Sequence, residues 1–274
     1  DGRGAFTWTH PGAGGRIRER DVRAVAASRT PSTTVSDTGQ QVPLTSRRRV
    51  IARRMVASRQ QTVPVTLTTK ADATNLVNLR EQFKTVGEHS AIPTYQDLIM
   101  KLVAELLIRH PTLAGRWEDD AIVLPATDEI HIGIAVDTAD GLLVPVVRNV
   151  RGLSVAELAA QTRQLIDRAR TGQLSAAEMQ GGVFTMTNLG AFGIDAFTPL
   201  INFPESAILG LGAIRREPVV LDDGQIVARH QWSLNLTFDH RVIDGAPAAR
   251  FVQDLANAVT NPAAWLLSAL PGAV

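Results

Sequence analysis

The alternation of apolar and polar positions predicts a folded region that begins near residue 42 and contains both helices and strands. Apolar residues recur at helical spacing over residues 48–58 and again in a longer stripe after residue 97, so both segments are expected to be helices. Period-two alternation predicts strands over residues 63–73 and 230–238. Further strands are expected over residues 130–137, 142–147, 183–187 and 206–214, and a last helix over residues 246–259.

Capping patterns mark the starts of three predicted helices: Thr94-x-x-Asp97, Ser154-x-x-Glu157 and Ser175-x-x-Glu178. A turn that ends in glycine, residues 138–141, is expected to join two of the strands. Several strands separated by long excursions predict an α/β fold, an α+β sandwich with a large mixed sheet flanked by helices. The irregular spacing of the elements argues against a doubly wound nucleotide-binding fold.

Three zones differ in composition. Residues 1–27 are rich in glycine and arginine, and residues 28–41 contain almost no large apolar side chain. Burial could not offset the ordering entropy of that second zone, so it is expected to be a linker. Residues 42–274 are expected to form the main domain.

Charge and cysteine content exclude several classes of function. The chain has 28 Lys and Arg against 27 Asp and Glu, which gives no electrostatic case for binding nucleic acid. It has no cysteine, so a disulfide framework, a thiolate zinc site and a cysteine nucleophile are all excluded. Any thiol chemistry must use thiols that substrates bring. Apolar runs such as residues 206–214 are far shorter than the roughly 20 residues that span a bilayer, and no secretory signal is visible at the start. A cytoplasmic location is the default expectation.

The strongest candidate for chemistry is the segment Phe238-Asp-His-Arg-Val-Ile-Asp-Gly245. His240 directly follows a strand that is expected to be half-buried, so rigid backbone would hold an imidazole that opens to a cleft, as a general base requires. Asp244 is expected to pin the turn, through an arginine, more than to exchange protons. On spacing alone, a surface histidine in a turn with a helix N-cap aspartate explains the same pattern.

A second candidate is Phe184-Thr-Met-Thr-Asn-Leu-Gly190, at the end of another predicted strand. The hydroxyls of Thr185 and Thr187, the amide of Asn188 and the flexible Gly190 offer hydrogen-bond donors for a developing oxyanion. An ordinary strand followed by a glycine turn explains this segment equally well.

The remaining motifs give weaker evidence for a functional site. Gly210-Leu-Gly212 lacks the remaining residues of a dinucleotide fingerprint and is expected to be core. The histidines other than His240 show no metal-ligand spacing, so no metal site is predicted. The arginines at 47–49 and 53–54 are expected to form a solvated helix face, where one of them could bind a phosphate or Asp244.

Seven segments together resemble the catalytic domain of the dihydrolipoamide acyltransferases, the E2 components of 2-oxoacid dehydrogenase complexes. The resemblance runs from about residue 42 to residue 267. The segments are Arg48-Arg-Val-Ile-Ala-Arg-Arg-Met55, Asp97-Leu-Ile-Met-Lys101, Ile132-Gly-Ile-Ala-Val-Asp137, Gly141-Leu-Leu-Val-Pro-Val146, Gly181-Gly-Val-Phe-Thr-Met-Thr-Asn-Leu-Gly190, Pro199-Leu-Ile-Asn202 with Ala207-Ile-Leu-Gly210, and Asp239-His-Arg-Val-Ile-Asp-Gly245. They occur in the family's order and at similar spacing.

The resemblance implies a chloramphenicol acetyltransferase-like fold that assembles as a homotrimer, with active-site channels between neighbouring subunits. By position, His240 is the base that deprotonates the incoming thiol, and Thr187 donates a hydrogen bond to the tetrahedral oxyanion. Asp244 holds the loop and is expected to pair with Arg48. Asn188 and Gly190 are predicted to contribute to cofactor binding.

The resemblance also implies the reaction and its partners. Acyl transfer is expected between dihydrolipoamide on a lipoyl domain and coenzyme A, without a metal and without an acyl-enzyme. Acetyl or branched-chain groups are favoured over succinyl. A lipoyl domain and the E1 and E3 components are expected partners, and trimers could assemble into a larger core. Residues 1–27 are expected to be a remnant that resembles, through residues 12–22, the C-terminal half of a peripheral subunit-binding domain. The lipoyl group is expected to come from a separate domain.

Two other functions remain open from the sequence. One is acetyl transfer from coenzyme A to a hydroxyl or amine acceptor on the same fold, although the order of the segments favours the first reading. The other is a non-catalytic scaffold subunit of such a complex. The presence of His240, Asp244 and Thr187 argues against an inert scaffold.

Overall fold

The computed structural model describes residues 42–85, 91–126, 129–139 and 141–268, with three isolated positions nearer the N-terminus. The chain divides into two compact units, residues 1–43 and 44–274. The expectations for residues 1–27 and for the linker at 28–41 therefore lie outside the described residues, apart from those isolated positions.

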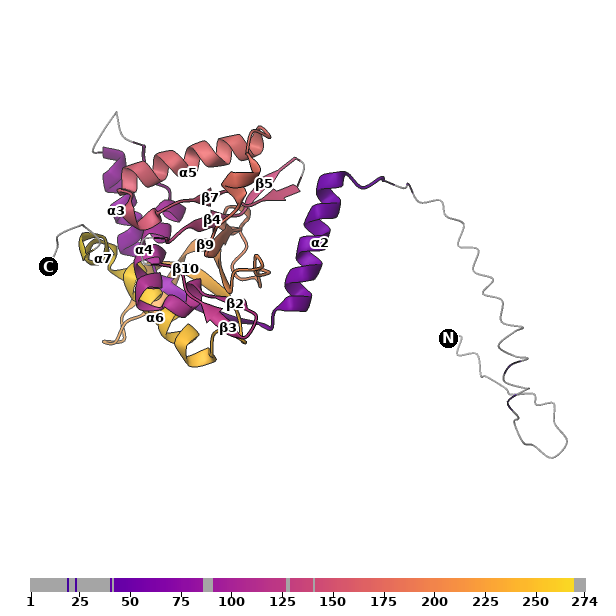
Figure 1. Ribbon diagram of the computed structural model, residues 1–274. Coiled ribbons are helices and arrows are strands. Elements are labelled where there is room, and N and C mark those ends of the chain that lie inside the picture. Colours follow the sequence, from indigo (N-terminus) through magenta and orange to yellow (C-terminus); the bar gives the residue numbers. More distant parts are fainter. Residues whose placement is uncertain are drawn as a thin grey trace, which may run out of the picture. The chain divides into compact units, whose positions relative to one another are not determined.

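Helices and strands of the second unit follow one another irregularly along the chain (Figure 1). The α-helices are α2 (Ser46–Gln61), α3 (Thr74–Thr85), α4 (Tyr95–Arg109), α5 (Val155–Arg170), α6 (Gly245–Thr260) and α7 (Pro262–Ser268). The strands are β1 (Pro64–Asp72), β2 (Arg116–Glu118), β3 (Ala121–Val123), β4 (Ile132–Ile134), β5 (Val136–Thr138), β6 (Gly141–Leu143), β7 (Val146–Val147), β8 (Phe184–Asn188), β9 (Ala207–Val220) and β10 (Ile226–Asp239). Short 3-10 helices are η1 (Pro111–Ala114), η2 (Val150–Gly152), η3 (Ala176–Met179) and η4 (Gly190–Phe192).

The central sheet is mixed, with strand order β1-β10-β9-β8-β4-β7. Strand β8 runs parallel to β9 and to β4, whereas the other neighbouring strands are antiparallel. Two short hairpins, β2–β3 and β5–β6, form two-stranded sheets apart from the central sheet. A large mixed sheet with flanking helices is the predicted fold class, which is therefore confirmed.

One face of the sheet carries the hydrophobic core. Leu234 and Phe238 of β10 join Phe184 of β8 and residues of α4 and α6 in one buried cluster. The rings of Phe184 and Phe251, on α6, lie 6.2 Å apart. Burial of this cluster stabilises the fold, at roughly 25 cal/mol per Å² of apolar surface removed from water.

The other face of the sheet is covered by the connection over residues 189–206. Phe197 lies where a Cβ on Gly210 would be, and the main-chain oxygen of Asp195 occupies the corresponding space at Gly212. Glycine is required at both positions because any side chain would displace this connection. The prediction that Gly210-Leu-Gly212 belongs to the core is confirmed by the burial of all three residues.

Because both faces are covered, the expectation of a half-buried strand before His240 is wrong. The polar residues of that strand are as buried as its apolar ones: Ser233, Asn235, Thr237 and Asp239. Hydrogen bonds compensate the burial of Asn235, Thr237 and Asp239. The amide of Asn235 donates to the main-chain oxygen of Gly210 (3.3 Å) and accepts from the hydroxyl of Thr68 (2.9 Å).

Most predicted elements are present, but two predicted strands are each split. Residues 130–137 form β4 and β5, and residues 142–147 form β6 and β7, because only β4 and β7 join the central sheet while β5 and β6 form a hairpin. Gly141 has the positive φ (114°) that the predicted glycine-ended turn requires. The strands at β9 and β10 extend beyond their predicted bounds, to the turn at Leu221–Gln225.

The capping boxes of Thr94 and Ser154 are confirmed, since side chain and main chain bond reciprocally at both helix starts. The same contacts form at Ser175, but they open only the 3-10 helix η3. Helix α3 and the hairpin β2–β3 were not predicted. The hairpin positions are exposed apart from Val123, which is partly buried, so they leave almost no alternating pattern of apolar residues to detect.

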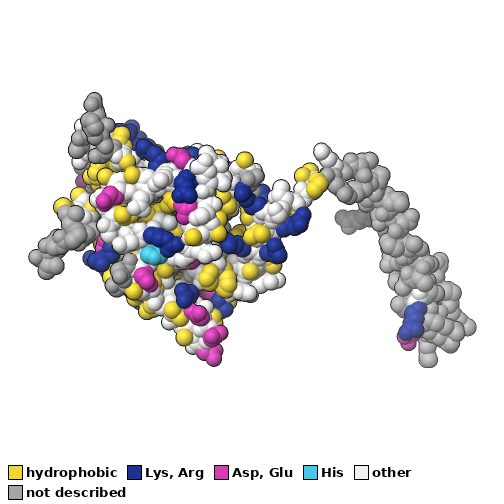
Figure 2. Space-filling model, turned by 45° about the horizontal axis from the view of Figure 1, so that its top comes forward, with side chains coloured by type: hydrophobic (Ala, Val, Ile, Leu, Met, Phe, Trp, Pro, Cys, Tyr) yellow, Lys and Arg dark blue, Asp and Glu magenta, His cyan; other side chains and the backbone are white. Residues whose placement is uncertain are grey.

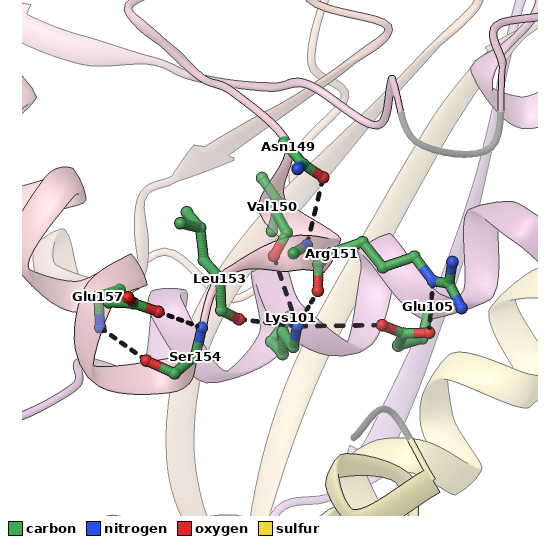
Figure 3. Close-up of polar contacts among 9 residues, drawn as sticks. Lys101, Glu105, Asn149, Val150, Arg151, Leu153, Ser154 and Glu157 are labelled. Carbon is green, nitrogen blue, oxygen red and sulfur yellow. Dashed lines mark hydrogen bonds and ion pairs between the residues drawn. The ribbon is translucent and has the colours of Figure 1, made fainter. Parts of the chain in front are cut away.

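Lys101 of α4 ties this helix to the segment before α5 (Figure 3). Its ammonium group is buried and donates to the main-chain oxygens of Arg151 (2.5 Å) and Leu153 (2.8 Å), and Glu105 lies 4.0 Å away. Burial lowers the pKa of Lys101, and the nearby carboxylate of Glu105 opposes that shift. Lys101 thus has a structural role: it donates hydrogen bonds to carbonyl groups that the short η2 turn leaves unpaired.

Acidic and basic side chains are interspersed with apolar ones on the face seen in Figure 2, in keeping with the near-zero net charge. Over the residues that the structure covers, none of the helices has the length and apolarity needed to cross a bilayer.

Candidate active site at the end of strand β10

His240 stands at the end of β10, in the turn that leads to α6. Its main-chain nitrogen donates to the oxygen of Val63 (2.8 Å), which fixes the backbone at this point. Its ring packs 5.8 Å from the ring of the fully buried Phe238, while 42% of its own side chain is exposed. The imidazole is therefore held from one side and open to solvent on the other; the predicted cleft beside it stays a prediction.

Asp244 lies beside His240, with its carboxylate oxygen 3.9 Å from Nδ1 of the imidazole. Asp244 occupies the N-cap position of α6, yet its side chain makes no capping hydrogen bond. A carboxylate near Nδ1 favours the tautomer that carries its proton there, and this leaves the lone pair of Nε2 available as a base.

Asp239 is a further residue of the site, one to which the sequence patterns assign no role. Its buried carboxylate accepts hydrogen bonds from the main-chain nitrogen of Val63 (3.0 Å) and from the guanidinium of Arg241 (2.6 and 3.1 Å). Burial alone would raise the pKa of Asp239, but these hydrogen bonds and the charge of Arg241 bring it below its ordinary value. The carboxylate is therefore ionised at neutral pH.

Thr187 lies on β8, and its side chain is partly buried. Alternation along the strand places it on the same face as Thr185, opposite Phe184 and Met186 of the core. Among the described residues its hydroxyl has no hydrogen-bond partner, which leaves it available to a bound molecule.

The other predicted donor on β8, Thr185, is already used within the fold. Its hydroxyl lies 2.6 Å from the carboxyl group of Glu205, and the amide of Asn202 donates to both residues (3.2 and 3.0 Å). Thr185 is buried, so the expectation that it could stabilise an oxyanion is wrong. Burial raises the pKa of Glu205 to about 8, although the hydrogen bonds from Thr185 and Asn202 oppose this.

Asn188 and Gly190 are bonded to each other. The side-chain oxygen of Asn188 accepts from the main-chain nitrogen of Gly190 (2.9 Å), and a Cβ at Gly190 would lie 2.3 Å from the main-chain oxygen of Gly212. Close packing against β9 thus accounts for the glycine. Asn188 also lines a cavity of about 370 Å³ with Tyr95 and Arg163, so its predicted part in cofactor binding stays a prediction.

Within one chain, Thr187 and His240 do not come together. Thr187 pairs with Gly210 on β9, and Gly210 pairs with Asn235 on β10, five residues before His240. At about 3.3 Å per residue and 4.8 Å between strands, the two Cα atoms are roughly 19 Å apart. That separation exceeds the combined reach of the two side chains toward a shared atom.

Arg48, the predicted partner of Asp244, lies in the first turn of α2. Its main-chain nitrogen bonds the hydroxyl of Thr45, and its guanidinium lies beside Gly141. Asp244 forms its ion pair with His240, so pairing with Arg48 stays a prediction.

The part of the chain that the structure covers contains no group of three or more metal-ligating side chains. His110 instead contacts Asp254 (2.8 Å), and Nδ1 of His131 lies 3.1 Å from the main-chain nitrogen of Asn149.

We expect E205Q to remove a pH dependence of stability. Burial raises the pKa of Glu205 to about 8, so the stability that the protonated carboxyl group contributes is fully present below the ordinary pKa of a glutamate and is lost as the pH rises through 8. Glutamine keeps the hydrogen-bonding shape without the charge. Melting temperatures at pH 5.5 and 9 should therefore show E205Q gaining on the wild type as pH rises.

The control is E81Q. The pKa of Glu81 is lowered by its hydrogen bond to Lys84, so its contribution is lost as pH falls. E81Q should not gain on the wild type at pH 9. Parallel behaviour of the two variants would contradict the buried, neutral carboxyl group at position 205.

Comparison with known protein families gives one match that covers most of the chain. Residues 36–267 match the family described as 2-oxoacid dehydrogenases acyltransferase (catalytic domain). A dihydrolipoyllysine-residue acetyltransferase component of the acetoin cleaving system of Bacillus subtilis is 38% identical, over 93% of this chain and 65% of the relative. The corresponding component of the Bacillus subtilis pyruvate dehydrogenase complex is 41% identical, over 81% of this chain and 50% of the relative. The chain thus spans half to two thirds of the length of these relatives.

Solved structures agree with these relatives. Azotobacter vinelandii dihydrolipoamide acetyltransferase is 39% identical, with a TM-score of 0.80 over 84% of this chain and 94% of that chain. Its crystallographic and enzymatic study addressed the catalytic roles of a serine, a histidine and an asparagine; the asparagine follows the histidine by four positions, the spacing of His240 and Asp244. The cubic core of a pyruvate dehydrogenase multienzyme complex is 37% identical, with a TM-score of 0.78 over 84% of this chain and 94% of that chain.

Proposed function

Since the chain belongs to the 2-oxoacid dehydrogenase acyltransferase (catalytic domain) family, we propose that it moves an acyl group between the thiol of dihydrolipoamide and the thiol of coenzyme A. The observation that carries this proposal is His240, an imidazole fixed through its main chain and open to solvent, with a carboxylate beside Nδ1. A thiol is a weak nucleophile until it is deprotonated. A neutral imidazole is a base of suitable strength to remove that proton near neutral pH.

The proposed reaction has two proton transfers. Nε2 of His240 removes the proton of the incoming thiol, and the thiolate attacks the carbonyl carbon of the thioester. A tetrahedral oxyanion forms, to which the hydroxyl of Thr187 donates a hydrogen bond. The bond to the departing sulfur then breaks, and that sulfur takes the proton from the imidazolium of His240. No bond forms between the acyl group and the protein.

The roughly 19 Å between Thr187 and His240 in one chain supports a site shared by two copies, in which His240 of one copy faces Thr187 of the next. A homotrimer provides three such sites.

Helix α2 supports the same assembly. Ser58 is its sole buried residue, and Val50 and Val56 are exposed. A helix this exposed gains little from its own chain, so packing against a second copy would supply the missing contacts. Assembly of trimers into a larger core, and binding of a lipoyl domain with E1 and E3 components, are proposed on the same family grounds.

Acetyl or branched-chain groups are the proposed acyl groups. The two Bacillus subtilis relatives, at 38% and 41% identity, are named acetyltransferase components, whereas a succinyltransferase component from Haemophilus influenzae is 33% identical.

The test is to incubate the purified chain with acetyl-, isobutyryl- or succinyl-coenzyme A and dihydrolipoamide, and to quantify the acyl-dihydrolipoamide by chromatography. Transfer from acetyl- or isobutyryl-coenzyme A at the highest rate is expected. Transfer to a hydroxyl or amine acceptor without transfer to dihydrolipoamide would overturn the proposed acceptor. Absence of any transfer would favour a non-catalytic scaffold.

A further inference from the structure

The turn that carries His240 is built around the buried carboxylate of Asp239. Asp239 is the last residue of β10 and is 2% exposed, whereas His240 and Arg241 after it are exposed. Both oxygens of the carboxylate are used: Oδ1 accepts from the main-chain nitrogens of Val63 (3.0 Å) and Arg241 (3.1 Å), and Oδ2 accepts from Nη2 of Arg241 (2.6 Å).

Two hydrogen bonds connect Val63 to the turn that carries His240. The main-chain nitrogen of Val63 donates to the carboxylate of Asp239, and the main-chain oxygen of Val63 accepts from the nitrogen of His240. Asp239 and His240 are adjacent in the chain, so the two bonds close a ring across the start of β1. The ring fixes the backbone of His240 independently of its side chain.

The main chain of Asp239 forms further hydrogen bonds outside this ring. Its main-chain nitrogen donates to the oxygen of Ser206 (2.8 Å), at the start of β9, and its main-chain oxygen accepts from Val242 and Ile243 (3.0 Å each). The guanidinium of Arg241 lies 5.3 Å from the ring centroid of Trp117, on the hairpin β2–β3. Val63, Ser206 and Trp117, from three separate parts of the chain, therefore contact the pair formed by Asp239 and Arg241.

Charge is balanced at the same place. Arg241 compensates the negative charge of Asp239, and Asp244 is the carboxylate that remains close to the imidazole. Loss of the charge on Asp239 would leave the guanidinium of Arg241 without its partner, one residue from His240. A positive charge there disfavours the protonated imidazole.

We propose that Asp239 is a positioning residue for the transfer reaction: its carboxylate, held by Arg241 and Val63, sets the orientation of His240 and balances the charge beside the imidazole. This inference rests on the proposed function of His240. It concerns the placement of the base and requires no contact between Asp239 and substrate.

The experiment compares D239N with the wild type. Asparagine keeps the shape of the side chain but replaces one acceptor by a donor and removes the charge. We expect kcat to fall about 10- to 100-fold, because a misplacement of about 1 Å can cost a factor of that size, while KM for both thiol substrates stays near the wild-type value. The acidic limb of the pH profile of kcat/KM should move to lower pH.

Two further variants complete the design. R241Q keeps the carboxylate and its bond to Val63 while removing the guanidinium, so it provides a second test if D239N does not fold. E217Q is the matched control, since it breaks the exposed ion pair between Lys70 and Glu217. R241Q should also lower kcat with little change in KM, and E217Q should match the wild type.

An independent readout separates this inference from the proposed function. In uniformly labelled protein, the imidazole resonances of His240, assigned with H240A, should change in chemical shift and in titration midpoint in D239N or R241Q, and should stay unchanged in E217Q. Unchanged His240 resonances in both folded variants, or an unchanged kcat and pH profile, would overturn the positioning role. If the wild type transfers no acyl group while these resonances shift as expected, the proposed function fails and the positioning of His240 stands.

Discussion

Replacing His240 by alanine should lower kcat/KM for acyl transfer by a factor on the order of 10²–10⁴, the usual contribution of a positioned general base. The imidazole of His240 is partly exposed, and the main-chain nitrogen of His240 is bonded to Val63, just before β1. Without it, the thiol must lose its proton to water. The measurement is the initial rate of acyl-dihydrolipoamide formation, at pH 7 and at higher pH.

The rate deficit of H240A should shrink as pH rises, because hydroxide then supplies the thiolate that the imidazole would have generated. H230A is the matched control, since His230 lies on β10, ten residues before His240. Turnover by H240A close to the wild-type rate would show that another group acts as the base. The fold should be unaffected, because the side chain of His240 is partly exposed.

Replacing Thr187 by alanine should lower kcat by about 10²–10³-fold, the range seen when one donor to an oxyanion is lost. The KM values should change little, because the hydroxyl is needed most when negative charge develops on the carbonyl oxygen. Steady-state kinetics with both thiol substrates separate these parameters.

T187S and T187V distinguish the hydroxyl from the space that it fills. Serine retains the donor and should keep most of the activity, whereas valine has nearly the shape of threonine and should behave like alanine. Equal activity of T187V and the wild type would contradict an oxyanion role. The neighbouring Thr185 is a poor comparison, because its hydroxyl is committed to Glu205 inside the fold.

Local patterns in the sequence located most of the fold. Period-two alternation placed β10 and so put His240 just beyond its end, and the capping boxes at Thr94 and Ser154 marked two helix starts correctly. These features depend on residues close together in the chain. The burial of Asp239 was missed because alternation assigns polar positions to a solvated face, and here the connection over residues 189–206 covers that face.

Features that depend on the order of the strands in the sheet cannot be predicted from these local sequence patterns. Glu205 follows a proline in a connection without periodic pattern, and its burial results from the way this connection crosses the sheet to Thr185. The distance between Thr187 and His240 likewise depends on the register of β8, β9 and β10. Neither the order of strands nor their register can be read from alternation within one strand.

Co-assembly of H240A chains with T187A chains tests most directly whether His240 of one copy works with Thr187 of another. If each site takes its histidine and its threonine from different copies, random mixing should restore both groups in about one site in four. Activity of the co-expressed, differently tagged mixture should then rise to about a quarter of the wild-type value, well above either variant alone. A mixture no more active than the average of the two separate variants would contradict the shared site.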